Sequence, residues 1–272
     1  MNMTKQRLTI TLSASTLNKI DNLIDGKKIR SRSHAIETLL QQSLQPQVKL
    51  AIILAGDKNP QAEIKKPLTK INQEPLIIHT LKLLAKHGVE KIIILTNKKG
   101  KILETVIEKN NLNEQLQIRF IFEEKSLGTA GALKNATKYL TEPFYCLHAD
   151  ILTNIDLQQM AQFHEKEQPV ATIAVKPRMT QDSYDNVYLQ GNQVVDFQPK
   201  KDNQTVSIVN TGVYLFTPEI LNYIPDQKVS LLEKDVFPQL AANNKLCAYT
   251  FQGMWFDVGS DRNYKQAIKK LY

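Results

Sequence analysis

Apolar strand-like runs alternate with amphipathic helical segments over residues 50–148, and this alternation constrains the fold more than any other feature. Four segments have the short apolar runs that are typical of buried strands: residues 50–55, 91–95, 117–122 and 144–148. Three segments have helical spacing of apolar residues: 75–87, 101–109 and 130–140. This order predicts an α/β fold with a doubly wound, mainly parallel (Rossmann-like) sheet, with ligands beyond the carboxyl ends of its strands.

The chain on either side of this region is organised differently. After about residue 170 the strands shorten and hairpin-like turns appear, as at residues 189–193, so we expect an added mixed β lobe. At the other end, residues 1–45 have the pattern of a small β-α-α domain, and Pro46 prevents its second helix from continuing. The expected domains are therefore residues 1–45 and residues 49–272.

The small domain begins with a strictly alternating strand at residues 7–12. Its apolar face consists of Leu8, Ile10 and Leu12, and its polar face consists of Arg7, Thr9 and Thr11. Two helices are expected next, capped by Ser13 or Ser15 and by Ser31 or Ser33. One strand and two helices cannot bury a core alone, so we expect two copies to pair their strands beneath four helices.

This segment resembles the ribbon-helix-helix family of DNA-binding proteins over almost all of residues 5–44. The resemblance implies a homodimer or higher oligomer that reads double-stranded DNA with its ribbon and holds a phosphate at the second helix. The residues implied in DNA binding are Arg7, Thr9, Thr11, Arg30, Ser31 and Arg32. Residues 1–44 carry seven basic and three acidic side chains, half of the net charge of +8. The alternative is a dimerisation domain that does not bind DNA.

Composition favours a cytoplasmic protein that does not enter a membrane. No apolar run is long enough to span a bilayer, and the N-terminus lacks the apolar segment of a secretory signal. Cys146 and Cys247 are isolated and lack metal-ligand spacing, so both thiols are expected to be buried and reduced.

The first candidate binding site lies within residues 51–68. The apolar run 51–55 is followed by Gly56, which would let backbone N–H groups approach phosphate oxygens. Asp57 opposes this interpretation, because a carboxylate repels a triphosphate. The loop therefore bears directly on whether the protein is an enzyme.

Five segments of the larger domain, in matching order, resemble the sugar-1-phosphate nucleotidyltransferases, also called nucleotide-sugar pyrophosphorylases. They are Gly56 with 66–68, residues 126–132, residues 144–150 with 253–259, residues 197–201, and residues 209–214. The chain departs from the family pattern at four places, two of which are single residues where the family has glycine: Ala149 before Asp150, and Asp185 after Tyr184. Residues 57–63 replace a Gly-x-Gly-x-Arg motif, and Pro199 replaces a sugar-binding glutamate.

The resemblance implies transfer of a nucleoside monophosphate from a triphosphate to a sugar 1-phosphate, with release of pyrophosphate. It implies catalytic roles for Lys66 and Lys200, and a sugar contact from Asn210. The implied nucleotide-binding residues are Ala55, Gly56, Leu127, Gly128 and Thr129. Asp150 and Asp257 would hold Mg²⁺, a hard cation that takes carboxylate and phosphate oxygens.

The altered loop leaves a second interpretation open. A domain that keeps the base-side and metal-side residues, but has lost part of the phosphate loop, could bind a nucleotide or nucleotide-sugar without making it. Joined to a DNA-binding head, it would be a ligand-responsive transcriptional regulator, provided that the ligand prefers one arrangement of the dimer.

Overall fold

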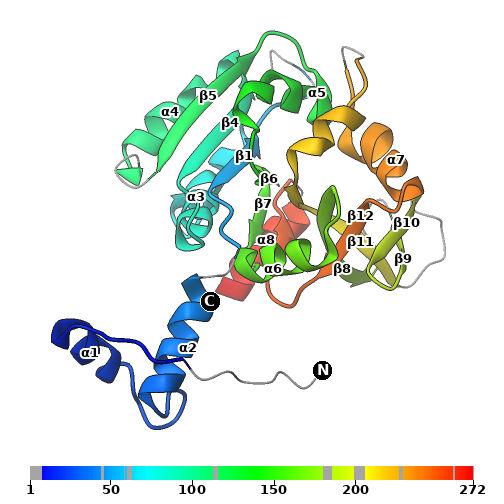
Figure 1. The fold of residues 1–272 in the computed structure, drawn as a ribbon. Coiled ribbons are helices and arrows are strands. Elements are labelled where there is room, and N and C mark those ends of the chain that lie inside the picture. Colours follow the sequence, from blue (N-terminus) through cyan, green and yellow to red (C-terminus); the bar gives the residue numbers. More distant parts are fainter. Residues whose placement is uncertain are drawn as a thin grey trace. The chain divides into compact units, whose positions relative to one another are not determined.

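The computed structural model describes residues 8–43, 46–57, 59, 63–112, 116–179, 186–198, 206–226, 229–259 and 261–271. The chain divides into two compact units, Met1–Gln45 and Pro46–Tyr272, and each is described by itself (Figure 1). No helix among the described residues is both long enough and apolar enough to cross a membrane.

The first unit contains two helices, α1 (Ala14–Asp21) and α2 (Arg32–Ser43). The Ser13 hydroxyl accepts the N–H of Thr16 at 3.2 Å and caps α1. The Ser31 hydroxyl accepts the N–H of His34, also at 3.2 Å, at the start of α2. One of the two serines predicted for each cap is thus confirmed, because each supplies an acceptor to an otherwise unpaired helical N–H.

The strand expected over residues 7–12 is not formed by its described part, residues 8–12. A strand needs a neighbour for its backbone hydrogen bonds, and no described segment of the single chain pairs with it. Leu8, Ile10 and Leu12 are 79%, 47% and 37% exposed. In the described part of this unit, burial is limited to Ile20 and Ala35, so its apolar residues lack a core of their own.

The second unit is built on a nine-stranded sheet in the order β5-β4-β1-β6-β11-β8-β12-β10-β9 among its described residues. The strands are β1 (Leu50–Leu54), β4 (Lys91–Asn97), β5 (Gln117–Glu123), β6 (Phe144–His148), β8 (Ala171–Met179), β9 (Asn186–Gln190), β10 (Gln193–Gln198), β11 (Val206–Phe216) and β12 (Leu246–Thr250). Two small ladders accompany it: β2 (Lys70–Ile71) with β3 (Glu74–Pro75), and β7 (Ile151–Thr153) with β13 (Trp255–Asp257).

Helices and helical turns connect these strands. The α-helices are α3 (Leu76–Lys86), α4 (Lys101–Glu108), α5 (Gly128–Asn135), α6 (Leu157–Glu167), α7 (Phe237–Ala242) and α8 (Asp261–Leu271). Short helical turns are η1 (Lys66–Leu68), η2 (Lys98–Gly100), η4 (Thr137–Tyr139), η5 (Pro218–Tyr223) and η6 (Leu232–Val236), the last of π type.

The β-α-β region occurs as predicted. β5, β4, β1 and β6 are parallel neighbours, and Ile53 of β1 pairs with Ile94 on one side and Leu147 on the other. Alternate residues of β1 face opposite layers. Ala51 and Ile53 pack with α3, α4 and α6, whereas residues 50 and 52 pack with α5 and α7. The sheet is therefore doubly wound, with helices on both faces (Figure 1), and apolar side chains are buried on each face.

The expectation of an added β lobe is corrected. β11 runs antiparallel to both β6 and β8, with Val213 opposite Leu147. β12 then runs parallel to β8. The mixed strands therefore extend the parallel half as one continuous sheet, because β11 supplies the backbone hydrogen bonds that the edge of β6 would otherwise lack.

Candidate functional site

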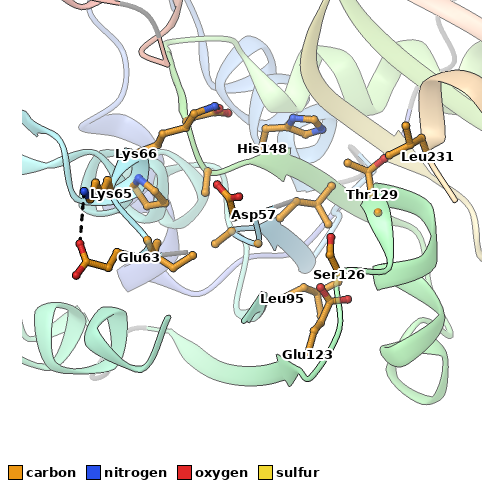
Figure 2. A pocket seen from close by; sticks show the side chains of 18 residues that line it. Asp57, Glu63, Lys65, Lys66, Leu95, Glu123, Ser126, Thr129, His148 and Leu231 are labelled. Carbon is orange, nitrogen blue, oxygen red and sulfur yellow. Dashed lines mark hydrogen bonds and ion pairs between the residues drawn. The ribbon is translucent and has the colours of Figure 1, made fainter. Parts of the chain in front are cut away.

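A cavity of about 720 Å³ lies where the parallel strands end (Figure 2). β1, β4, β5 and β6 each contribute residues to its wall, together with residues 63–67, the start of α5 and Leu231. Ala55 continues the β1 edge, donating its N–H to the Leu95 carbonyl at 2.8 Å. Gly56 and Asp57 follow it, and both are exposed on the cavity wall. The opening segment thus lies at the position expected for a ligand site in a parallel sheet.

Lys66 and Asp150 meet at this cavity. Lys66 begins η1 and Asp150 follows β6, and the Lys66 Nζ lies 2.7 Å from the Asp150 Oδ2. Burial alone would lower the pKa of Lys66. The charge and hydrogen bond of Asp150, with the charges of Asp257 and Asp57, raise that pKa above its usual value. This lysine is a fixed positive charge among three carboxylates.

Strand pairing brings the second candidate metal ligand, Asp257, close to Asp150 and Lys66. In the β13–β7 ladder, Asp257 lies opposite Ile151, and the Val258 N–H donates to the Asp150 carbonyl at 2.9 Å. A β-carbon on Gly259 would lie 2.9 Å from the Asp257 Oδ1 and 3.0 Å from the Lys66 Nζ. Two acids that are distant in sequence therefore converge around one lysine.

This donor set fits Mg²⁺ in part. No group of three or more His, Cys, Asp or Glu residues suited to a metal occurs in the described portion of the chain. Mg²⁺ is commonly bound by one or two carboxylates, with phosphate oxygens and water as its remaining ligands. Asp150 and Asp257 can supply the protein part of such a set.

Gly128 and its neighbours form the opposite wall. Gly128 has φ +74°, and a β-carbon there would lie 2.3 Å from the Ser230 carbonyl oxygen. The same oxygen accepts the N–H groups of Ala130 and Gly131, while the Ser230 N–H donates to the Leu127 carbonyl. The loop predicted to hold the nucleotide is therefore fastened along its backbone to Ser230, and Gly128 and Thr129 line the cavity.

The sequence did not indicate Glu123, the last residue of β5. Its side chain lines the cavity and is 8% exposed, and burial raises its pKa to about 7. The Asn135 Nδ2 donates to its Oε1 at 3.4 Å, and its Oε2 would lie 3.6 Å from a β-carbon on Gly56. A carboxylate held beside a cavity wall is a candidate acceptor for a ligand's N–H groups.

Glu233 is a second acid whose role the sequence did not predict. It receives hydrogen bonds from the Thr129 hydroxyl at 3.3 Å and the Tyr214 hydroxyl at 3.1 Å. The Tyr214 hydroxyl in turn accepts from the Asn210 Nδ2 at 2.9 Å. Asn210, the predicted sugar-binding residue, is outside the cavity lining but is connected to it through these bonds.

The candidate DNA-binding residues lie in the first unit. Thr9 and Thr11 are exposed. The Arg30 side chain donates to the Lys27 carbonyl at 3.4 Å. Arg32 makes a bidentate ion pair with Asp21, with N···O distances of 2.7 and 2.8 Å. This ion pair joins α1 to α2. Five further residues of the sequence analysis, Arg7, Tyr184, Asp185, Pro199 and Lys200, lie outside the described residues, as do 58 and 60–62 of the altered loop.

Comparison with known proteins gives one family and a consistent fold. A family model described as "Nucleotidyl transferase" matches residues 61–272. A mannose-1-phosphate guanyltransferase from Yarrowia lipolytica is 31% identical over 206 residues, 74% of this chain and 56% of that protein. The mannose-1-phosphate guanylyltransferase catalytic subunit beta of Xenopus tropicalis is 29% identical, over 74% and 57%. The chain thus spans little more than half of these relatives.

Two solved structures share the fold. HddC from Yersinia pseudotuberculosis, complexed with GMP-PN, superposes with a TM-score of 0.70 at 22% identity, covering 83% of this chain and all of that one. A UDP-glucose pyrophosphorylase complexed with UDP-glucose gives a TM-score of 0.69 at 20% identity, covering 83% and 98%. At these identities the likeness concerns the fold alone.

Proposed function

Because this chain belongs to the nucleotidyl transferase family, we propose that its second unit transfers a nucleoside monophosphate from a nucleoside triphosphate to a sugar 1-phosphate. The observation that carries the proposal is the convergence of Asp150 and Asp257 on Lys66, where Lys66 and Asp150 line the cavity. A cation between two acids suits a reaction in which phosphoryl charge must be held and neutralised.

In this reaction an oxygen of the sugar phosphate attacks the α-phosphorus of the nucleotide. A new P–O bond forms, the bond to the β-phosphate oxygen breaks, and pyrophosphate leaves with its electron pair. Lys66 would hold a phosphoryl oxygen, and Lys200 is proposed to hold the sugar phosphate. Asp150 and Asp257 would hold Mg²⁺, which, when bound, neutralises phosphate charge. Catalysis needs positioning and charge neutralisation rather than a covalent intermediate.

We further propose guanine as the base and mannose 1-phosphate as the acceptor. Mannose-1-phosphate guanyltransferases are among the relatives, and Glu123 supplies a chemical reason for guanine. One carboxylate can accept both the N1–H and the 2-amino group of guanine. Adenine has neither of these donors and could offer the carboxylate only its 6-amino group, so it would form fewer hydrogen bonds with Glu123 than guanine.

The test is release of pyrophosphate from a panel of triphosphates and sugar 1-phosphates in the presence of Mg²⁺. GTP with mannose 1-phosphate should give the highest rate, and Lys66→Ala should lower it at least about a hundredfold. Lys70→Ala is the matched control, because this nearby exposed lysine of β2 lies outside the cavity lining and should keep most of the activity. If no pair in the panel releases pyrophosphate, the enzymatic proposal is wrong.

Asp57 supports the second candidate function, a domain that binds a nucleotide or nucleotide-sugar without making it. Its carboxylate lines the cavity beside Gly56, where it would face the phosphates of a ligand. A protein of this kind would be stabilised by nucleotide-sugars and inactive in the pyrophosphate assay. Thermal unfolding with and without GDP-mannose separates the two functions when it is read together with that assay.

We also propose that residues 1–45 pair with a second copy as a ribbon-helix-helix dimer. The support is the alternating apolar face of Leu8, Ile10 and Leu12, which are 79%, 47% and 37% exposed in the single chain. Sedimentation should show a dimer that Ile10→Lys dissociates. Thr11→Lys, on the opposite face of the same segment, should leave the dimer intact. A monomeric wild-type protein would refute the pairing.

DNA binding by this dimer rests on its basic charge and on the exposed Thr9 and Thr11. In this proposal Arg30 and Ser31, which directly precede α2, would hold a phosphate, whereas Arg32 joins the helices through Asp21. Gel-shift assays on the DNA upstream of the protein's own gene should show binding that weakens in the Thr9→Ala, Thr11→Ala double variant. Unchanged affinity would remove these residues from base recognition.

A further inference from the structure

Glu233 connects two parts of the site that belong to different sequence motifs. One carboxylate oxygen receives the hydroxyl of Thr129, which lines the cavity on its nucleotide-binding side. The other receives the hydroxyl of Tyr214, which lies on β11, a strand that also carries Asn210. The carboxylate is 19% exposed, and the Tyr214 side chain is buried. These bonds form one continuous path from the nucleotide loop to Asn210.

The direction of each hydrogen bond along this path follows from the chemistry of the groups. Burial, with the charge of Glu233, raises the pKa of Tyr214 well above its usual value, so the phenol keeps its proton. That single proton is donated to Glu233, so the phenol oxygen can only accept from Asn210, and it does so at 2.9 Å.

Two hydrogen bonds then fix the orientation of the Asn210 amide, one at its nitrogen and one at its oxygen. Its Nδ2 faces Tyr214, and its Oδ1 accepts the Gly212 N–H at 3.1 Å. The pairing between β11 and β8 is irregular between Asn210 and Tyr214, so ladder hydrogen bonds do not by themselves fix the chain here. Within the part of the chain that the structure describes, one N–H of the amide is left for another acceptor, and a sugar hydroxyl is an acceptor of the required kind.

We propose that Glu233 is a positioning residue that sets the Asn210 amide for the sugar phosphate and ties it to the nucleotide loop through Thr129. The inference rests on the proposed transferase function and deepens it, because it assigns Glu233 to acceptor recognition. Glu233 acts through Tyr214 and touches neither the reacting phosphorus nor the attacking oxygen in this scheme.

The test replaces the carboxylate by an amide of the same shape. Glu233→Gln can donate as well as accept, so the phenol proton is no longer directed and the Asn210 amide loses its fixed partner. We expect kcat/KM for the sugar 1-phosphate to fall about tenfold, the effect of one directed hydrogen bond to a charged group, while the KM for the triphosphate changes less than about twofold. Tyr214→Phe should have the same effect.

The double variant of Glu233→Gln and Tyr214→Phe should lose no more than either single variant, because both break the same path. Losses that multiply, or a rise in the triphosphate KM of the same size, would overturn the proposal. Asp235→Asn is the matched control. Asp235 accepts the Leu231 N–H at 2.7 Å within the same turn. If Asp235→Asn lowers kcat/KM for the sugar 1-phosphate as much as Glu233→Gln does, the loss reflects the local stability of this turn and not the positioning of Asn210.

A binding measurement keeps this inference separate from the proposed activity. If the wild-type protein releases no pyrophosphate, the transferase proposal fails, and calorimetry of GDP-mannose and GDP then decides the role of Glu233. Glu233→Gln should lower the affinity for GDP-mannose about tenfold and leave that for GDP unchanged. Equal losses for both ligands, or no loss for either, would refute it.

Discussion

Replacing Gly128 by alanine should destabilise the second unit and damage the nucleotide loop. Two costs add at this position. With φ +74°, an alanine would adopt the left-handed conformation, which costs about 1 kcal/mol after the stiffer unfolded chain is taken into account. Its β-carbon would also lie 2.3 Å from the Ser230 carbonyl oxygen, so that this backbone must move.

The second cost can be worked from the hydrogen bonds that the movement breaks. The Ser230 carbonyl accepts the N–H groups of Ala130 and Gly131, at 3.0 and 3.2 Å. Each such bond contributes about 1 kcal/mol to stability. Together with the backbone strain, Gly128→Ala should lower the free energy of unfolding by about 3 kcal/mol.

Gly88→Ala isolates the first cost. Gly88 has a similar φ of +79°, and nothing lies within 4 Å of a β-carbon placed there, so about 1 kcal/mol is expected. Urea unfolding followed by fluorescence is a direct assay, because Trp255 is the single tryptophan and is buried in the second unit. If Gly128→Ala and Gly88→Ala lower the free energy of unfolding equally, the hydrogen bonds of Ser230 do not hold the loop as described.

Burial raises the pKa of Glu123 to about 7, so between pH 4.5 and 7 the folded state keeps a proton that the unfolded state releases, and stability falls as pH rises. Burial lowers the pKa of His164 to about 4, so its contribution is opposite: stability is lost as pH falls from 6.5 to 4. Urea unfolding of Glu123→Gln and His164→Gln across pH 4–8 should therefore show slopes that diverge from wild type in opposite senses, and parallel curves would contradict both assignments. Asp57→Asn should tighten binding of GTP by roughly threefold to tenfold in calorimetry and leave GMP unchanged, because only the longer phosphate chain would feel the lost charge. Gly259→Ala should reduce the transferase rate and raise the Mg²⁺ concentration needed for half-maximal rate, because its β-carbon would displace Asp257; an unchanged Mg²⁺ dependence would refute that geometry.

The part of the fold that could be predicted is the part whose elements follow one another in both sequence and space. β1, β4, β5 and β6 are short apolar runs separated by helices, and parallel pairing follows from that order. β11 could not be placed in this way. Its position between β6 and β8 depends on pairing between distant segments, which no local pattern encodes.

The same distinction separates the site residues. Lys66, Asp150 and Asp257 were recognisable by family motifs, and the structure brings them together. Glu123 and Glu233 were not, because an acid at a strand end or in a helical turn usually faces solvent. Their burial arises from other segments: Asn135 and the wall of the cavity for Glu123, and Tyr214 and Thr129 for Glu233.

The short β7–β13 ladder has a consequence for the order in which the protein acquires its site. About a hundred residues separate its two strands, and closing so long a loop is a slow, entropically unfavourable step. During synthesis the parallel strands β1, β4, β5 and β6 can assemble with Lys66 and Asp150 in place, while Asp257 has yet to emerge. The paired carboxylates are thus a late product of folding, and a released chain that ends before residue 255 would have Asp150 without its second acid.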